Sequence, residues 1–159
     1  MFNLVLVNPE IPPNTGNIGR LCVAVGARLH LVKPLGFHID DKHLKRAGLD
    51  YWEKLDLVIW ESLDQYLNCA DPNRTILTGS KRGQIYYDLE FRPWDHILFG
   101  PETSGLNVAL FDRFPSRIAR IPIDLGKTRS LNLSTSVGII VFEGLRQLKF
   151  VPGAKTNRY

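Results

Sequence analysis

The stretch Ile97-Leu98-Phe99-Gly100-Pro101-Glu102-Thr103-Ser104-Gly105-Leu106 joins an apolar run to a polar turn that holds two glycines. The first three residues have the composition of a buried strand, and the glycines permit a tight turn before a short helix. A strand, a turn and a helix in succession form the repeating unit of α/β folds. This stretch therefore predicts an α/β fold with a tight turn at the end of a strand, where exposed amides could contact a ligand.

The same alternation extends along the chain in both directions. Runs rich in Val, Ile and Leu predict strands buried on both faces, at residues 2–7, 28–32, 57–60, 75–78, 96–99 and 118–121. Helical patterns separate them, at residues 17–25, 41–47, 62–68, 108–114 and 131–148. Three of these helices have a suitable N-cap residue: Asp40 for residues 41–47, Ser62 for residues 62–68, and either Ser130 or Asn132 for residues 131–148. The order predicts a mainly parallel sheet flanked by helices, in one domain over residues 1–159 with a loosely ordered tail at 152–159.

Composition narrows the class of protein. The 159 residues are 44% hydrophobic and 23% charged, as in ordinary globular proteins. The first residues lack a basic signal-peptide region, and no apolar run approaches the ~18 residues of a membrane span. Cys22 and Cys69 are too few for a disulfide framework, and the four histidines have no metal-ligand spacing. We therefore expect a cytoplasmic protein with no metal and no membrane contact.

Net charge leaves the partner open. The formal charge of +4 permits an RNA partner, but from charge alone a solvated surface is the more common explanation.

Polar and glycine-rich stretches follow predicted strands at residues 8–19, 79–83, 100–105 and 122–130, at the sheet edge where α/β folds bind ligands. Three regions could carry chemistry. In residues 12–20, Gly16, Gly19 and Arg20 could offer free helix amides and a guanidinium to an anion. A capped helix with a surface arginine fits that pattern as well. In residues 100–105, exposed amides and Glu102 could contact a ligand or orient Arg20. A plain strand–turn–helix connection with a solvated carboxylate is the alternative there.

The third stretch covers residues 120–134 and leads into the last predicted helix. Ile121 and Ile123 could line a flat pocket for a ring, while Ser130, Asn132 and Ser134 could bind a ligand or cap the helix. That helix has an apolar stripe, which is typical of a core or dimer contact, through Val137, Ile140, Val141 and Leu145.

Together the three stretches resemble the three motifs of the SPOUT RNA methyltransferases. The order matches: Asn-x-Gly-x-x-x-Arg at residues 14–20, Phe-Gly-Pro-Glu-x-x-Gly-Leu at 99–106, then Ile-Pro at 121–122 and Arg-Ser-Leu-Asn-Leu-Ser at 129–134. The likeness includes residues 10–20 and 40–51 and covers nearly the whole chain. It is strongest to the small SPOUT enzymes that act as tRNA (cytidine/uridine-2′-O-)-methyltransferases on the wobble nucleotide.

The resemblance implies more than the residues alone. It implies a C-terminal trefoil knot, a homodimer with the first and last helices at its interface, a tRNA substrate, and S-adenosylmethionine as cofactor, leaving as S-adenosylhomocysteine. The general rule that chains avoid knots would not have predicted the first of these. Carried over, the cofactor pocket would use Leu77, Thr78, Gly79, Gly100, Pro101, Glu102, Gly105, Ile121, Pro122, Ile123, Ser130, Leu131 and Asn132.

The resemblance also points to Arg20, Glu102 and Asn132 as the catalytic candidates. A guanidinium stays protonated in proteins and is a poor general base. We therefore expect Arg20 to hold a phosphate and to stabilise charge developing on the ribose oxygen, with phosphate or water taking the proton. Glu102 and Asn132 would position the cofactor or Arg20.

Two positions depart from the family pattern. Ile123 stands where many members have Met, and Phe142, beside Glu143, stands where many have Tyr. These departures bear on wobble specificity more than on methyl transfer. Three alternatives stay open: an rRNA 2′-O-methyltransferase, a catalytically silent RNA-binding protein of the same fold, and a nucleotide-binding regulator. The missing dinucleotide fingerprint counts against the last.

Overall fold

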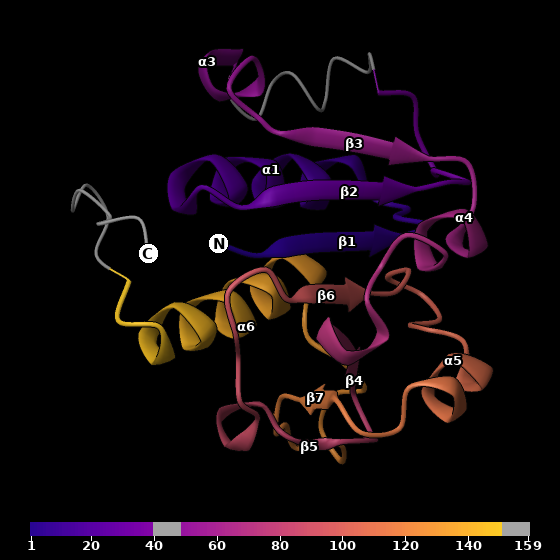
Figure 1. Ribbon diagram of the computed structural model, residues 1–159. Coiled ribbons are helices and arrows are strands. Elements are labelled where there is room, and N and C mark those ends of the chain that lie inside the picture. Colours follow the sequence, from indigo (N-terminus) through magenta and orange to yellow (C-terminus); the bar gives the residue numbers. More distant parts are fainter. Residues whose placement is uncertain (40–48, 151–159) are drawn as a thin grey trace.

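The computed structural model describes residues 1–39 and 49–150 (Figure 1). Two predictions lie outside these residues: the helix at 41–47 with Asp40 as its cap, and the loosely ordered tail at 152–159.

Within the described residues, seven strands form one sheet in the order β3-β2-β1-β6-β4-β7-β5, and every pairing is parallel. The strands are β1 (Asn3–Val7), β2 (Arg28–Val32), β3 (Leu57–Trp60), β4 (Thr75–Gly79), β5 (Gln84–Ile85), β6 (His96–Phe99) and β7 (Ile118–Arg120). All six predicted strands are confirmed, each to within one residue at either end. The strand β5 was not predicted, because two residues are too short to give a pattern.

Helices cover both faces of the sheet (Figure 1). They are α1 (Pro12–Val25), α3 (Leu49–Trp52), α4 (Leu63–Leu67), α5 (Val108–Arg113) and α6 (Leu133–Gln147), with short 3-10 helices at Pro72–Arg74 and Tyr86–Asp88. One buried core joins α1 and α6 to side chains such as Leu4, Leu29 and Ile97, and a second joins α4 and α5 to side chains such as Val5 and Leu98. Burial on both faces explains why the central strands have apolar runs and no alternation. The predicted burial of residues 57–60 on both faces is wrong, because β3 lies at the sheet edge and Ile59 is 40% exposed.

The first helix begins at Pro12, so the predicted start at residue 17 is wrong. Proline is tolerated in a first turn because the amides there have no intrahelical partner. Gly16 and Gly19 consequently lie inside the helix and are buried. They are not the anion-binding loop that the spacing suggested, and Arg20 lies more than two turns into α1.

Two predicted caps are confirmed. The Ser62 hydroxyl accepts a hydrogen bond from the Gln65 amide at 3.1 Å, at the start of α4. At the start of α6, Asn132 Oδ1 accepts from the Thr135 amide at 3.2 Å, so Asn132 rather than Ser130 is the cap. The helix α3 was not predicted, since four residues fall below the length at which helical periodicity is visible.

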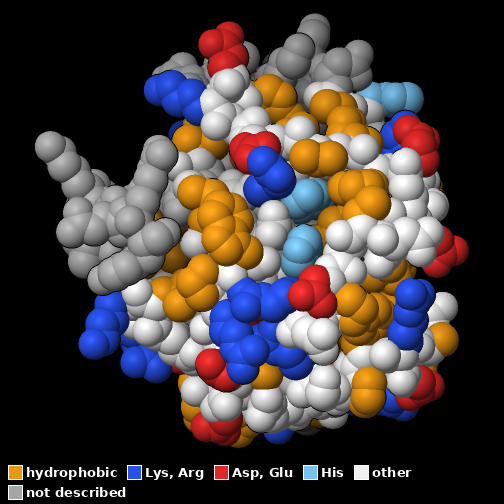
Figure 2. Space-filling view, in the orientation of Figure 1, with side chains coloured by type: hydrophobic (Ala, Val, Ile, Leu, Met, Phe, Trp, Pro, Cys, Tyr) orange, Lys and Arg blue, Asp and Glu red, His pale blue; other side chains and the backbone are white. Residues whose placement is uncertain are grey.

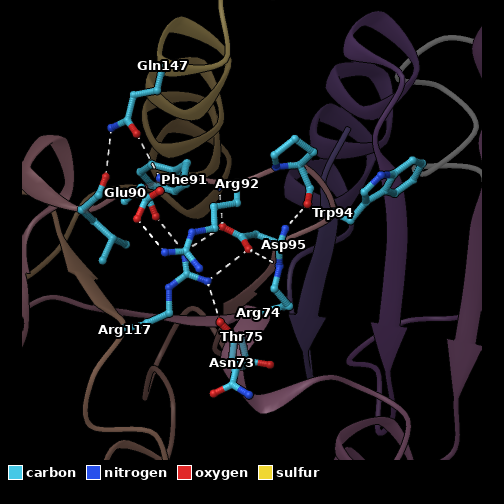
Figure 3. A network of polar contacts seen from close by, with 12 residues as sticks. Asn73, Arg74, Thr75, Glu90, Phe91, Arg92, Trp94, Asp95, Arg117 and Gln147 are labelled. Carbon is cyan, nitrogen blue, oxygen red and sulfur yellow. Dashed lines mark hydrogen bonds and ion pairs between the residues drawn. The ribbon is translucent and has the colours of Figure 1, made fainter. Parts of the chain in front are cut away.

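A buried carboxylate joins the amino ends of three central strands (Figure 3). Asp95 precedes β6 and is fully buried, with ion pairs to Arg74 Nε at 3.0 Å and to Arg117 Nη2 at 2.9 Å. These arginines directly precede β4 and β7. Gln147 of α6 accepts from the Phe91 amide and donates to the Leu89 carbonyl, which ties α6 to the segment before β6. Figure 2 shows Lys and Arg side chains gathered on this face over β4 and β6, with acidic side chains at their margin.

Candidate active site

A cleft of about 690 Å³ lies at the carboxyl ends of β4, β6 and β7. Apart from Asn14, its buried lining residues are apolar, among them Phe99, Ala119 and Ile140. Its exposed lining comes from the segments that follow these strands and from the start of α1. A volume within about 300–1,000 Å³, an apolar floor and a few convergent polar groups are typical of small-molecule sites.

Most of the predicted cofactor-binding residues meet in this cleft. The lining contains Thr78, Gly79, Gly100, Pro101, Glu102, Gly105, Ile121, Ile123, Ser130, Leu131 and Asn132. Two predicted residues do not line it. The Leu77 side chain is fully buried in the core on the α4 and α5 face, and Pro122 is exposed outside the lining.

Glu102 reaches from the turn after β6 to the start of α1. Its Oε2 accepts from the Glu10 amide at 2.8 Å, and its Oε1 accepts from the Ile11 amide at 3.3 Å and from Asn14 Nδ2 at 2.9 Å. Ile11 is the N-cap of α1 and supplies no side-chain cap of its own. The carboxylate therefore satisfies amides that the helix leaves unpaired, and its negative charge suits the helix N-terminus.

Asn14 links all three sequence motifs. It is buried, its Nδ2 donates to Glu102, and its Oδ1 accepts from Asn132 Nδ2 at 2.9 Å. Asn132 in turn caps α6. A single path of hydrogen bonds thus runs from the turn after β6 through α1 to the loop after β7, and it fixes the walls of the cleft relative to one another.

A second link runs parallel to this path. The Glu10 carboxylate accepts from the Thr103 amide at 3.0 Å and from the Thr103 hydroxyl at 2.8 Å. Neither Glu10 nor Asn14 was singled out from the sequence. The signal for Asn14 was present, because it opens the Asn-x-Gly-x-x-x-Arg motif; Glu10 had no comparable signal.

The turn after β6 closes so tightly that only glycine fits at its first position. A Cβ built on Gly100 would lie 2.2 Å from both the carbonyl carbon of Gly105 and the amide nitrogen of Leu106. Gly105 itself has a φ of 70°, in the left-handed region that glycine tolerates best. The tight turn predicted from the sequence is confirmed, and it places residues 100–105 along one wall of the cleft.

Arg20 does not line this cleft. Its guanidinium carbon lies 5.6 Å from the centre of the Tyr51 ring, and the Tyr51 hydroxyl donates to the Gly16 carbonyl at 2.6 Å. Burial raises the pKa of Tyr51, while the charge of Arg20 acts in the opposite direction. Of the three predicted catalytic residues, the structure therefore brings Glu102 and Asn132 together and leaves Arg20 on an exposed face of α1. Glu102 makes its described hydrogen bonds to the start of α1, not to Arg20.

Within residues 1–39 and 49–150, no three His, Cys, Asp or Glu side chains are grouped so that they could hold a metal ion. No helix in this part of the chain has the length and apolar character needed to cross a bilayer.

Comparison with known proteins identifies the family of this chain. A model of the SpoU rRNA Methylase family matches residues 1–142, which include all three motifs. The chain belongs to this family. The predicted resemblance to SPOUT RNA methyltransferases and the predicted α/β fold class are thereby confirmed, while the knot stays a prediction from the family.

Individual relatives extend over almost the full chain. A tRNA (cytidine(34)-2′-O)-methyltransferase of Burkholderia pseudomallei (strain 1106a) is 48% identical over 157 residues, covering 97% of this chain and 100% of the relative. The protein of the same description from Escherichia coli (strain K12) is 43% identical over 155 residues, covering 97% and 98%.

Solved structures are similar as well. One, described as giving structural insights into the 2-OH methylation of C/U34 on tRNA, has a TM-score of 0.84 and 43% identity, covering 94% of this chain and 97% of the other. An AdoMet-bound rRNA methyltransferase from Sinorhizobium meliloti has a TM-score of 0.81 and 25% identity, covering 92% and 56%.

Proposed function

We propose that this chain transfers a methyl group from S-adenosylmethionine to the ribose 2′-oxygen of the wobble pyrimidine in tRNA. The observation that carries the proposal is the path Glu102–Asn14–Asn132, which assembles the three family motifs into one cleft. Relatives named as cytidine(34) methyltransferases, at 43–48% identity over nearly the full chain, support the tRNA substrate over rRNA.

The cleft fits the cofactor in shape and chemistry. Its buried floor, with Phe99, Leu106 and Leu133, suits a flat purine ring, and the turn after β6 brings backbone close to any ligand in the cleft. Thr78, Ser130 and Asn132 supply polar side chains around that floor. When bound, the sulfonium supplies a methyl group that is already activated. The chain's own residues have to orient the ribose, exclude water and stabilise the oxygen that loses its proton.

Arg20 suits the last of these tasks, because a guanidinium can hold a phosphate and stabilise negative charge on a nearby oxygen. It does not line the cleft of its own chain. We therefore propose that Arg20 acts in the cleft of a second copy, within a homodimer.

The surface of α1 and α6 supports such a dimer. A hollow of about 320 Å³ lies between these helices and is lined by Ala24, Val25, Phe142, Leu145, Arg146 and Phe150. Phe142 is 59% exposed beside this hollow, so the surface offers a large apolar side chain that a partner could cover. A tRNA-modifying dimer of this kind would work in the cytoplasm, without membrane contact.

Mixed dimers test this arrangement. Arg20→Ala and Asn132→Ala should each abolish most methyl transfer when prepared alone. If Arg20 acts across the dimer, co-expression of the two should restore about one quarter of wild-type activity, since half of the dimers are mixed and each has one intact site. Mixed dimers as inactive as the single variants would show that Arg20 does not act across the dimer.

The substrate is tested separately in cells. Nucleoside mass spectrometry of tRNA from cells that lack this protein should show loss of a 2′-O-methyl pyrimidine. Loss from rRNA instead would assign the enzyme to the alternative substrate, and no loss would favour a catalytically silent RNA-binding protein.

A further inference from the structure

The charged residues of the cleft are almost all cationic. Lys81, Arg82, Arg129 and Glu102 are the charged side chains in its lining. Glu102 already accepts three hydrogen bonds from the start of α1. Among the described residues, the one acidic partner of Arg82 is Asp112, in a long, exposed ion pair at 3.6 Å. The cleft therefore presents positive charge without an acidic side chain dedicated to balancing it.

Lys81 and Arg129 are the least compensated of these cations. Within residues 1–39 and 49–150, neither has an acidic side chain within 4.0 Å. They come from different walls, since Lys81 lies in the loop between β4 and β5 and Arg129 lies in the loop between β7 and α6. Both are exposed, in contrast to the buried apolar floor between these walls. Such exposed cations are free to move onto an anionic ligand at little desolvation cost.

The cofactor cannot account for this charge. S-adenosylmethionine carries a sulfonium, an ammonium and one carboxylate, so it brings net positive charge into the cleft. One cation could pair with the carboxylate, but further cations would repel the sulfonium. An RNA backbone, with one negative charge at each phosphate, is the complementary ligand.

We propose that Lys81, which lines the cleft together with Arg129, binds a backbone phosphate of the RNA next to the ribose that is methylated. This inference rests on the proposed function, because it takes RNA as the ligand of the outer cleft. The β4–β5 loop thereby becomes part of the substrate site, while the glycine turn after β6 and the apolar floor stay with the cofactor.

Salt dependence of RNA binding tests the phosphate contact without any methyl transfer. The probe is a tRNA anticodon stem–loop, titrated onto the full chain over a series of salt concentrations. In Lys81→Gln, affinity should fall several-fold at physiological salt, and the slope of log K against log salt should decrease by about 0.7–0.9. Lys81→Arg, which keeps the charge, should retain the wild-type slope. Lys127→Gln is the matched control. Lys127 lies in the loop between β7 and α6 but does not line the cleft, and it pairs with Asp124 at 3.5 Å.

Calorimetric titration of S-adenosylmethionine without RNA separates the two sources of negative charge. Lys81→Gln should bind the cofactor as the wild type does. A weakened cofactor affinity would assign Lys81 to the methionine carboxylate and overturn the proposal, and so would an unchanged salt slope for the stem–loop.

These outcomes also separate the proposal from the proposed function. A wild-type chain that binds the stem–loop with a Lys81-dependent slope but transfers no methyl group would keep the phosphate contact and refute the enzyme. If the Lys81→Gln variant methylates tRNA as well as the wild type, at unchanged slope and KM, the enzyme is supported and the phosphate contact is refuted.

Discussion

At the scale of single residues, Glu102 holds the turn after β6 against the start of α1. Replacing it with Ala would remove the acceptor for two backbone amides and for Asn14. Hydrogen bonds to charged groups contribute about 1.5–3 kcal/mol each, so we expect Glu102→Ala to lower the free energy of unfolding by about 2–4 kcal/mol and to weaken cofactor binding. Denaturant titration and calorimetry measure the two effects. Glu102→Gln, which keeps one acceptor oxygen, should fall between Ala and wild type. Unchanged stability and cofactor affinity in Glu102→Ala would contradict this role.

The partners of Glu102 show what the sequence can predict at this scale. The motif marked Glu102 as a positioning residue inside a binding loop, and the structure places it in the cleft wall. The hydrogen-bond path was not predictable, because Asn14 lies 88 residues from Glu102 along the chain and 118 residues from Asn132. Neither spacing nor composition reports which amide groups meet across such separations.

At the scale of elements, the turn between β6 and α5 depends on Gly100. A methyl group there would overlap the backbone of Gly105 and Leu106 at 2.2 Å, which no rotation of a side chain can relieve. We expect Gly100→Ala to abolish cofactor binding, measured by calorimetry, and to lower thermal stability. Gly126→Ala is the matched control, since its Cβ would meet only the flexible side chain of Asp124, at 3.2 Å. Wild-type cofactor affinity in Gly100→Ala would show that this turn is not a wall of the binding site.

The network at the opposite end of the strands supports a second prediction. Asp95→Asn leaves Arg74 and Arg117 beside a neutral amide at a fully buried position (Figure 3). Breaking a buried ion pair by removing one partner is destabilising by about 3–5 kcal/mol. Denaturant unfolding should therefore show a loss of that size, whereas the exposed Asp124→Asn should change little. A loss under about 1 kcal/mol would mean that the network does not hold the strands together.

The elements themselves were largely predictable, and the exceptions have physical causes. Runs rich in Val, Ile and Leu without polar alternation made β1, β2, β3, β4, β6 and β7 recognisable from composition, although β3, at the sheet edge, is only partly buried. The start of α1 was not, because Pro12-Pro13-Asn14-Thr15-Gly16 has the composition of a loop. The helix forms there nonetheless because Glu102, from a distant turn, supplies the cap that its own N-terminus lacks.

At the scale of the whole molecule, stability should depend on pH through a buried histidine. His30 Nδ1 accepts from Trp60 Nε1 at 3.0 Å, and its Nε2 lies 3.3 Å from Asn3 Oδ1, an arrangement that suits the neutral ring. Burial, reinforced by the nearby His96 and Arg28, lowers the pKa of His30 to about 4. An unfolded chain takes up this proton near pH 6.5, before the folded protein does.

The direction of the pH dependence follows from the difference between the pKa of His30 in the folded and in the unfolded chain. The free energy of unfolding should be greatest above pH 7 and decrease as the pH falls from 6.5 toward 4, by up to about 1.4 kcal/mol per pH unit for this one group. Burial lowers the pKa of His96 as well, which adds in the same direction. Denaturant titrations between pH 7 and 5 measure the slope, and His30→Gln should flatten it. Equal slopes in the variant and the wild type would show that His30 is not its source.

The central claim is methyl transfer to one ribose oxygen, and one measurement tests it most directly. Purified protein is incubated with methyl-labelled S-adenosylmethionine and two tRNA substrates that differ only in having a ribose or a 2′-deoxyribose at the wobble pyrimidine. We predict stoichiometric labelling of the first substrate and none of the second. Equal labelling of both, or no labelling of either, would contradict the account.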